Sequence, residues 1–353
     1  VITLLVGLVI IGGINRIASF AGSIVPTMAF IYVIGSLSVL IFNYSNILPS
    51  FYIIIHDVFN GSAIAGGFLG ASFSTAFTYG VARGLYSNEA GQGSSPIAHA
   101  TSNTKHSIEE GFVSILEPFI DTLIICTLTG LVILASGVWT EKYQNDFERT
   151  SLYFLGQSES QQDVSDQINS YIKCRDNGGD CFSGEILIEN GISKEANTVF
   201  HNRSIAENIS FFKDEKLFSG VIKIKNGLLI TQGINVKGES LVKSAVLTSK
   251  AFNKGFFGNY GEFIVSIGLL LFAFSTMITW SYYGDRCTLY LFGEQALIYY
   301  RILYLLAMFI AGSGLIDTEV IWNFALITVA ASTLPNLLGM FLLRKKMKFL
   351  LKD

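Results

Sequence analysis

Long apolar runs separated by short polar segments dominate both ends of the chain. A helix that crosses about 30 Å of hydrocarbon needs about 20 mostly apolar residues. A shorter run lies at 297–312, and residues 1–13 resemble the end of another run. The pattern therefore predicts an all-α polytopic membrane protein. The runs that reach spanning length are 24–43, 112–138, 262–283 and 320–343.

Residues 140–258 form a long polar segment with a different pattern. Within it, FSGEILIENG (182–191) and FSGVIKIKNG (218–227) match at seven of ten positions. Each alternates apolar and polar residues before an Asn-Gly pair, which is typical of a β-hairpin. We expect a small duplicated β module, and a chance similarity between two hairpins is the alternative.

The composition favours a membrane protein as well. Charged residues make up 14% of the chain, aromatic residues 13%, and the mean hydropathy is +0.48. These values are typical of chains with several membrane spans. The chain begins at Val1 within an apolar run, without an initiator Met or a signal-peptide pattern. We therefore expect that an N-terminal part is missing.

The stretch 62–82 is rich in Gly, Ala, Ser and Thr, so hydropathy alone does not show whether it crosses the membrane. The positions of Lys and Arg decide between the two possibilities. If 62–82 crosses the membrane, all ten cations of the short loops and the tail lie on one face, which the positive-inside rule makes cytoplasmic. If it does not cross, Arg16 lies opposite the other nine. We therefore expect a plasma-membrane protein, in bacteria of the inner membrane, with 140–258 outside and the C-terminus cytoplasmic. The ten cations are Arg16, Arg83, Lys105, Arg286, Arg301, Arg344, Lys345, Lys346, Lys348 and Lys352.

Two of the four cysteines lie in the outer segment. Cys174 and Cys181 flank a polar turn, CRDNGGDC, whereas Cys126 and Cys287 fall in or beside apolar runs. Because an extracytoplasmic compartment is oxidising, we expect a disulfide between Cys174 and Cys181. Two free thiols are the alternative.

Polar groups inside the apolar runs are the candidates for chemistry. Glu117 and Asp121 lie four residues apart, and ionisable groups at such depth commonly mark an ion or substrate pathway. We favour such a role for Asp121. Alternatively, Glu117 lies at the headgroup level and Asp121 bonds to a neighbouring helix.

Two further stretches have the composition of a transport site. Gly66, Gly67 and Gly70 surround Phe68 and could break a helix at the bilayer midplane, although close helix packing is a common role for glycine there. The other stretch combines hydroxyls that suit a hard cation such as sodium with an indole that could line a small apolar substrate. Hydrogen bonds from the hydroxyls to preceding carbonyls are the alternative. Its residues are Ser275, Thr276, Thr279 and Trp280.

Several long segments resemble the alanine or glycine:cation symporter family. They are RGLYSNEAGQGSSPIAHA (83–100), EPFIDTLIICTLTGLVILASGVW (117–139) and LLLFAFSTMITWSYYGDRCTLYLFG (269–293), together with the shorter SAVLTSKAF (244–252) and LPNLLGMFLL (334–343). The resemblance covers nearly the whole chain except about 142–240.

The resemblance implies sodium-coupled symport of alanine or glycine through a LeuT-type inverted-repeat fold. It implies that 62–82 is a broken helix facing the substrate with Gly66, Gly67 and Phe68. It also implies that 262–283 shares the substrate site through Thr276 and Trp280, and the sodium site. The sodium ligands expected on 262–283 are Ser275, Thr276 and Thr279.

The resemblance also suggests a division of the chain. We expect a first part of the transporter core at 1–139, an inserted extracytoplasmic β domain at 140–258, and a last part of the core with a basic tail at 259–353. The outer segment is longer than is usual in the family, and the family's first broken helix would precede Val1.

The glycine-rich segment NEAGQGS lies at the expected cytoplasmic mouth. Its glycines permit tight turns, and its polar side chains could bond to helix ends or to Arg83. A phosphate-binding loop would need a preceding strand and a following Lys-Ser/Thr pair, which are absent. We therefore interpret the segment as a gate. The expected gate residues are Arg83, Asn88, Glu89, Gly91 and Gly93.

Other classes of function are less consistent with the sequence. The four histidines show no metal-ligand spacing and no GxSxG motif occurs, so we expect no enzyme and no cofactor besides the transported sodium. The expected partners are a small neutral amino acid, Na⁺ and the lipid bilayer, without nucleic acid, and the expected functional unit is a monomer. The alternatives are a proton-coupled or differently selective carrier, and a membrane-anchored interaction or sensor protein.

Overall fold

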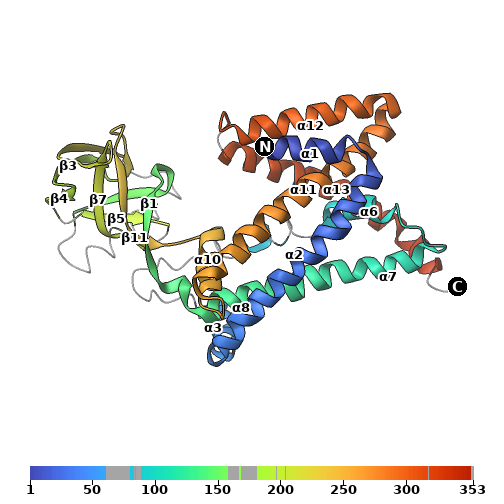
Figure 1. Cartoon of the computed structure of the whole chain (residues 1–353), viewed down its shortest axis with the longest axis horizontal. Helices are drawn as coiled ribbons and strands as arrows, with labels where there is room; N and C mark the ends of the chain where they lie inside the picture. Colours follow the sequence, from blue (N-terminus) through green and yellow to red (C-terminus); the bar gives the residue numbers. More distant parts are fainter. Residues whose placement is uncertain are drawn as a thin grey trace. The chain divides into compact units, whose positions relative to one another are not determined.

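Figure 1 shows a computed structural model of the chain, and two compact units make up the fold. The first unit holds the described residues of 1–42, 74–132 and 252–353, and the second those of 43–73 and 133–251. The structure describes residues 1–60, 80–82, 84, 89–157, 167, 181–195, 197–202, 204–316 and 318–350. The predicted site residues Gly66, Gly67, Phe68, Arg83, Asn88 and Cys174 lie outside the described residues, as does most of 62–82.

The first unit is helical. Five of its described segments are long and apolar enough to cross a membrane, and they contain or closely match the five predicted apolar runs. These segments are Arg16–Phe42, Ser107–Ser136, Gly258–Phe292, Glu294–Gly312 and Val320–Arg344. The helices are α1 (Ile2–Ile10), α2 (Ile14–Phe42), α5 (Glu89–Gln92), α6 (Ser95–His99), α7 (Ser107–Pro118), η2 (Phe119–Cys126), the start of α8 (Thr127–Ser136), η5 (Gly258–Tyr260), α11 (Gly261–Phe292), η6 (Glu294–Ala296), α12 (Leu297–Gly312) and α13 (Thr318–Leu350).

The segment η2 is a π-helix that continues α7 directly after Pro118. Proline has no backbone N–H, so the α-helical hydrogen bond to the preceding turn cannot form there. A wider π turn is one way to continue the helix past this gap, and π turns are frequent at functional sites. Asp121 lies on η2 and is exposed.

Helix α11 is the centre of the first unit. It packs along α2 and contacts α1 and α12. Ile10, Ile17 and Ile278 belong to a buried apolar cluster that joins α1, α2 and α11. At the end of α11, Asp285 pairs with Arg301 of α12 at 2.7 Å, with side chains only 9% and 16% exposed. Arg301 therefore lies in α12 and not in a short loop. Arg16 of α2 and Arg286 of α11, which the sequence also assigned to short loops, lie in helices as well.

The second unit contains the β strands. Its sheets have the orders β1-β11-β7-β8, β10-β9-β3-β4 and β2-β5-β6, and every pair is antiparallel. The strands are β1 (Lys142–Phe147), β2 (Leu152–Gln157), β3 (Gly184–Glu189), β4 (Ile192–Ser193), β5 (Asn197–His201), β6 (Ser204–Ile205), β7 (Glu207–Lys213), β8 (Lys216–Leu217), β9 (Gly220–Lys225), β10 (Leu228–Leu229) and β11 (Asn235–Leu241). The unit also includes η1 (Tyr44–Asn46), α3 (Ile47–Asn60), the end of α8, η3 (Val138–Thr140), η4 (Arg149–Ser151) and most of α10 (Ser244–Asn253).

Alternating residues of these strands form one apolar core. In β3 and in β9 two buried isoleucines alternate with exposed residues, as the sequence pattern predicts. The core includes Phe154, Ile186, Ile188, Phe211, Ile222 and Ile224.

Both predicted hairpins are confirmed. The Asn-Gly pairs at 190–191 and 226–227 connect β3 to β4 and β9 to β10, and all four residues have positive φ angles. Two-residue hairpin turns of this kind need positive φ at both positions, which Asn and Gly adopt most easily.

The two matching segments also pair with each other. β3 and β9 are antiparallel with Ile186 opposite Ile222, which are equivalent residues of the two copies. The amide of Gly191 donates to Phe218 O at 2.8 Å, and that of Gly227 donates to Phe182 O at 2.7 Å. Equivalent residues thus make equivalent bonds across a local two-fold axis, so each copy holds the turn of the other.

We predict that Gly191→Ala and Gly227→Ala each lower the melting temperature of the β strands, measured by circular dichroism. An L-residue in the left-handed region costs roughly 1–2 kcal/mol. Gly191→Ala is expected to be the more severe change, because its Cβ would lie 2.5 Å from Leu217 Cδ2 and 3.2 Å from Phe211 O. The nearest atom to a Cβ at Gly227 is 3.5 Å away. Gly130→Ala on α8, where the space is open, is the control and should not lower the melting temperature. Equal melting of wild type and both turn variants would contradict this account.

A second prediction concerns acid. His201 is 2% exposed and stacks on Phe147, and burial, then the charge of Lys243, lowers its pKa to about 4. The unfolded chain binds this proton near pH 6.5, so between about pH 6.5 and pH 4 the unfolded state holds more protons and the fold loses stability as pH falls. Thermal unfolding should therefore show a melting temperature that decreases across this window, and His201→Asn should reduce the decrease. His106→Asn, at an exposed position, is the control and should keep the wild-type dependence.

Candidate functional site

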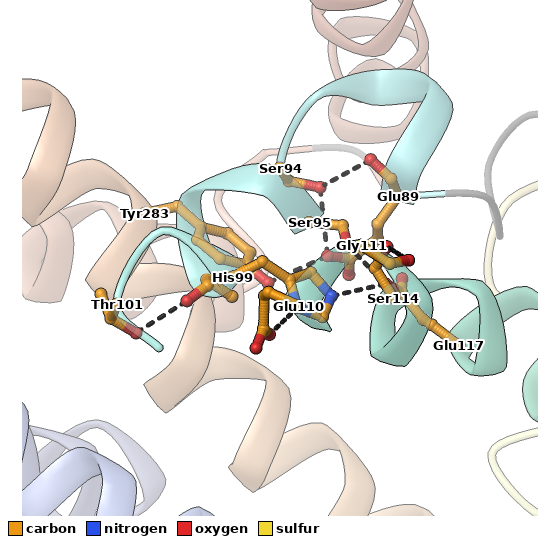
Figure 2. Close-up of polar contacts among 11 residues, drawn as sticks. Glu89, Ser94, Ser95, His99, Thr101, Glu110, Gly111, Ser114, Glu117 and Tyr283 are labelled. Atoms are coloured by element: carbon orange, nitrogen blue, oxygen red, sulfur yellow. Dashed lines mark hydrogen bonds and ion pairs between the residues drawn. The ribbon is translucent and has the colours of Figure 1, made fainter. Parts of the chain in front are cut away.

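A group of polar side chains gathers where α5, α6, α7 and α11 meet in the first unit (Figure 2). Because its donors and acceptors come from segments far apart in the sequence, the group ties these helices together. We call it the polar cluster; it consists of Glu89, Ser94, Ser95, His99, Glu110, Glu117 and Tyr283.

Glu89 connects the glycine-rich segment to α11. Its Oε2 atom accepts hydrogen bonds from Ser94 Oγ at 3.1 Å and from Tyr283 Oη at 3.0 Å. Hydrogen bonds to an ionised carboxylate are stronger than those between neutral groups. The Tyr283 contact spans 194 positions of sequence. Arg83, the partner that the sequence suggested for this segment, lies outside the described residues.

His99 lies between two carboxylates of α7. Its Nδ1 is 2.5 Å from Glu110 Oε1 and its Nε2 is 3.5 Å from Glu117 Oε2. Glu117 also accepts a short hydrogen bond from the hydroxyl of the buried Ser95. The hydrogen bond to Glu110 raises the pKa of His99, against a smaller opposing effect of burial. Only the protonated imidazole has N–H donors for both carboxylates.

Asn336 of α13 holds the same glycine-rich segment from another side. Its Nδ2 donates to Ala90 O at 2.9 Å and to Gly91 O at 3.0 Å. Gly93 has a φ of +92°, and a Cβ there would lie 3.1 Å from Asn336. Glycine at position 93 thus permits both the turn and the close approach of α13.

The predicted cation ligands all lie on α11. Ser275 is 4% exposed, and its hydroxyl donates to Phe272 O at 2.9 Å. Thr279 Oγ1 approaches Ser275 O at 3.1 Å and Thr276 O at 3.2 Å. These are the intrahelical bonds of the alternative interpretation. They use the hydroxyl protons and leave oxygen lone pairs, so they do not exclude cation binding.

Trp280 lies between these hydroxyls and the polar cluster along the same helix. It is 40% exposed, and its ring meets that of Tyr283 edge-on, with centroids 5.6 Å apart and an interplanar angle of 75°. Contacts therefore run from Trp280 to Tyr283 and on to Glu89.

The structure brings only part of the predicted site together. Glu89, Gly91 and Gly93 lie at the polar cluster or next to it, whereas Asp121 is exposed on η2. Within the described part of the chain, no group of three or more His, Cys, Asp or Glu could hold a metal ion. Cys181 is disulfide-bonded, but its predicted partner Cys174 is not described, so this pairing stays a prediction.

The sequence pattern alone does not single out several residues of this region. The available signal for such residues is a polar or ionisable side chain within or next to an apolar run, the feature that identified Glu117 as a candidate. A signal of this kind cannot say which segments meet. The missed residues are Ser94, Ser95, His99, Glu110, Tyr283 and Asn336.

Comparison with known proteins finds relatives among membrane transporters over most of the chain. A sequence profile described as the sodium:alanine symporter family matches residues 1–161 and 220–353. The chain is 29% identical to the sodium/alanine symporter AgcS of Methanococcus maripaludis, over 97% of the chain and 53% of that protein. It is 29% identical to an uncharacterized transporter of Haemophilus influenzae, over 98% of the chain and 54% of that protein. The amino-acid carrier protein AlsT of Bacillus subtilis is 37% identical over 39% of the chain and 29% of its own length. The chain thus spans about half the length of the first two relatives.

We predict that Asn336→Ala loosens the glycine-rich segment. The variant loses two hydrogen bonds to backbone carbonyls, each worth about 1 kcal/mol, so hydrogen exchange of the Gly93 amide should become roughly tenfold to thirtyfold faster. Mass spectrometry of the peptide that contains residues 89–93 measures this change. Asn323→Ala, at an exposed position of the same helix, is the matched control and should leave exchange unchanged. Equal exchange in wild type and Asn336→Ala would show that Asn336 does not hold the segment.

Proposed function

Because the chain belongs to the sodium:alanine symporter family, we propose that it provides the solute and cation pathway of a carrier for small neutral amino acids. Membership confirms the resemblance found in the sequence, and the family is one of transporters, not enzymes. The proposed transport is symport of alanine or glycine with sodium across the plasma membrane. The proposed mechanism is alternating access on a LeuT-type fold.

One observation carries this proposal: α11 joins a hydroxyl cluster to the polar cluster. Ser275 and Tyr283 are eight residues apart, which corresponds to about 12 Å along a helix. A change at the hydroxyls can therefore reach Glu89 through a single rigid element. Alternating access needs a link of this kind between a midplane site and a gate.

The chemistry of α11 suits a sodium ion. A hard cation prefers oxygen ligands, and the oxygens of Ser275, Thr276 and Thr279 lie within about one turn. The ring of Trp280 provides an apolar wall for a small side chain. We propose that Gly66, Gly67 and Phe68 complete the substrate site from a broken helix, as the family resemblance implies. Asp121 stands as a second candidate along the ion pathway.

The polar cluster is the proposed cytoplasmic gate. The distribution of Lys and Arg supports a cytoplasmic position for this end of the helices and an outer position for 140–258, according to the positive-inside rule. Asn88 and Arg83 are proposed to act with Glu89. Gly93 gives the segment the positive-φ turn that it needs to fit against Asn336, and the Gly91 carbonyl accepts a hydrogen bond from Asn336.

The test is sodium-dependent alanine uptake by reconstituted protein. We predict that Ser275→Ala or Thr276→Ala raises the sodium concentration for half-maximal uptake, with at least one variant showing a several-fold change. One lost ligand oxygen is worth roughly 1 kcal/mol, which corresponds to a change of this size. Thr276→Ala should also raise the alanine concentration for half-maximal uptake, because Thr276 is proposed to face the substrate.

Ser332→Ala is the matched control for these variants. The Ser332 hydroxyl donates to the carbonyl three residues earlier, as that of Ser275 does, but it is exposed on α13. This variant should keep the wild-type sodium dependence. If Ser275→Ala and Thr276→Ala also keep it, the cation binds elsewhere, and Asp121 becomes the next residue to test.

A further inference from the structure

His99 is held in a way that the proposed gate does not require. A neutral imidazole has one N–H donor, yet each ring nitrogen of His99 faces a carboxylate oxygen of α7. With neutral His99, one nitrogen would present its lone pair to a carboxylate, which is repulsive. The geometry therefore matches the imidazolium ion, which bonds to Glu110 through Nδ1 and presents a second N–H towards Glu117 at 3.5 Å.

The charges around His99 favour the same form. Glu110 and Glu117 face it from α7, and Glu89 and Tyr283 belong to the same cluster from α5 and α11. Arg286 of α11 lines a pocket together with Ala100 and Thr101, the two residues after His99. Lys105 lies in the loop between α6 and α7. Arg286 stacks on Tyr282 with its guanidinium 4.9 Å from the ring centroid. The acidic groups next to His99 thus gain a cation when it is protonated.

We propose that His99, with Glu110 and Glu117, is a proton-binding site that locks the gate when it is occupied. Glu110 and Glu117 act as the acceptors that set its affinity. This proposal rests on the proposed function of the polar cluster as the cytoplasmic gate. A proton from the water on that side binds to His99, α6 is tied to α7 through a charge-assisted hydrogen bond to Glu110 and an ion pair with Glu117, and the same proton returns to that water when the gate opens. No other group changes its charge in this step.

The sign of the effect on transport follows. The raised pKa belongs to the closed cluster, whereas His99 in an open gate titrates near its ordinary value of about 6.5. The extra stability of the closed gate is therefore complete below about pH 6.5 and is lost as pH rises through the higher value. Acid on the gate side should slow opening, and each opening should release protons.

The transport test uses proteoliposomes in which only the pH on the gate side is varied. Between about pH 8.5 and pH 6 we expect wild-type uptake to fall at least threefold, with a midpoint above about 6.5. His99→Gln should transport with a flat pH profile, because glutamine keeps one donor but cannot titrate. Glu110→Gln should move the midpoint downwards, since it removes the negative charge that lies 2.5 Å from His99 Nδ1. His106→Gln, at an exposed position outside the cluster, is the matched control and should keep the wild-type profile.

A second measurement is independent of transport. The chain has four histidines, so nuclear magnetic resonance of histidine-labelled protein gives few signals, and His99→Gln assigns one of them. We expect the His99 signal to titrate above about pH 6.5 in the wild type and at lower pH in Glu110→Gln.

Two results would overturn the proposal. One is a measured pKa of His99 at or below the ordinary value for histidine. The other is a His99→Gln variant that keeps the wild-type pH profile of uptake. A wild-type protein without cation-dependent amino-acid uptake would instead contradict the proposed function, and the His99 titration would still decide whether the proton site exists.

Discussion

The hydrogen bond from Tyr283 to Glu89 is the contact on which the proposed mechanism depends. It joins a short glycine-rich segment to α11, the helix with the most extensive packing in the first unit. It ties α11, the helix of Ser275, Thr276 and Thr279, directly to the proposed gate. The apolar contact of Ile97 of α6 with the same helix supports this connection. Asn336 of α13 holds the same segment, and His99 ties the neighbouring α6 to α7. Three separate contacts therefore fix this region against the surrounding helices. Each tie uses a polar group inside or beside an apolar span, where an unpaired polar group is costly.

The sequence predicted the features that depend on local pattern. Apolar runs gave the candidate spans, and alternation before Asn-Gly gave both hairpins, because each depends only on neighbouring residues. The glycines at 91 and 93 were also recognisable, since a glycine-rich segment predicts turns. Long-range pairs were not predictable: Glu89 with Tyr283, and Asp285 with Arg301, lie on different segments, and no local period reveals such contacts. The π-helix after Pro118 was missed because a proline in a span indicates a disturbed helix without indicating its form.

The β strands show how a repeated sequence can be held together. The two copies do not fold as separate units; β3 and β9 pair directly in one sheet, and each Asn-Gly turn bonds to the backbone of the other copy. A single hairpin is marginal in water, so pairing provides the apolar core that each copy lacks. The family profile matches the second copy from residue 220 but leaves 162–219 unmatched, which includes the first. The local two-fold symmetry is therefore built partly from residues outside the family match.

Whether the glycine-rich segment leaves α13 during transport is the central question. Spin labels at Ser102→Cys and Ser332→Cys, both exposed positions, would report the distance between the loop after α6 and α13. Cys126 and Cys287 are free and would first be replaced by serine. We predict that pulsed electron paramagnetic resonance of reconstituted protein shows two distance populations, and that sodium with alanine changes their ratio relative to sodium alone. A single distance, unchanged under all conditions, would contradict the assignment of the polar cluster as the gate.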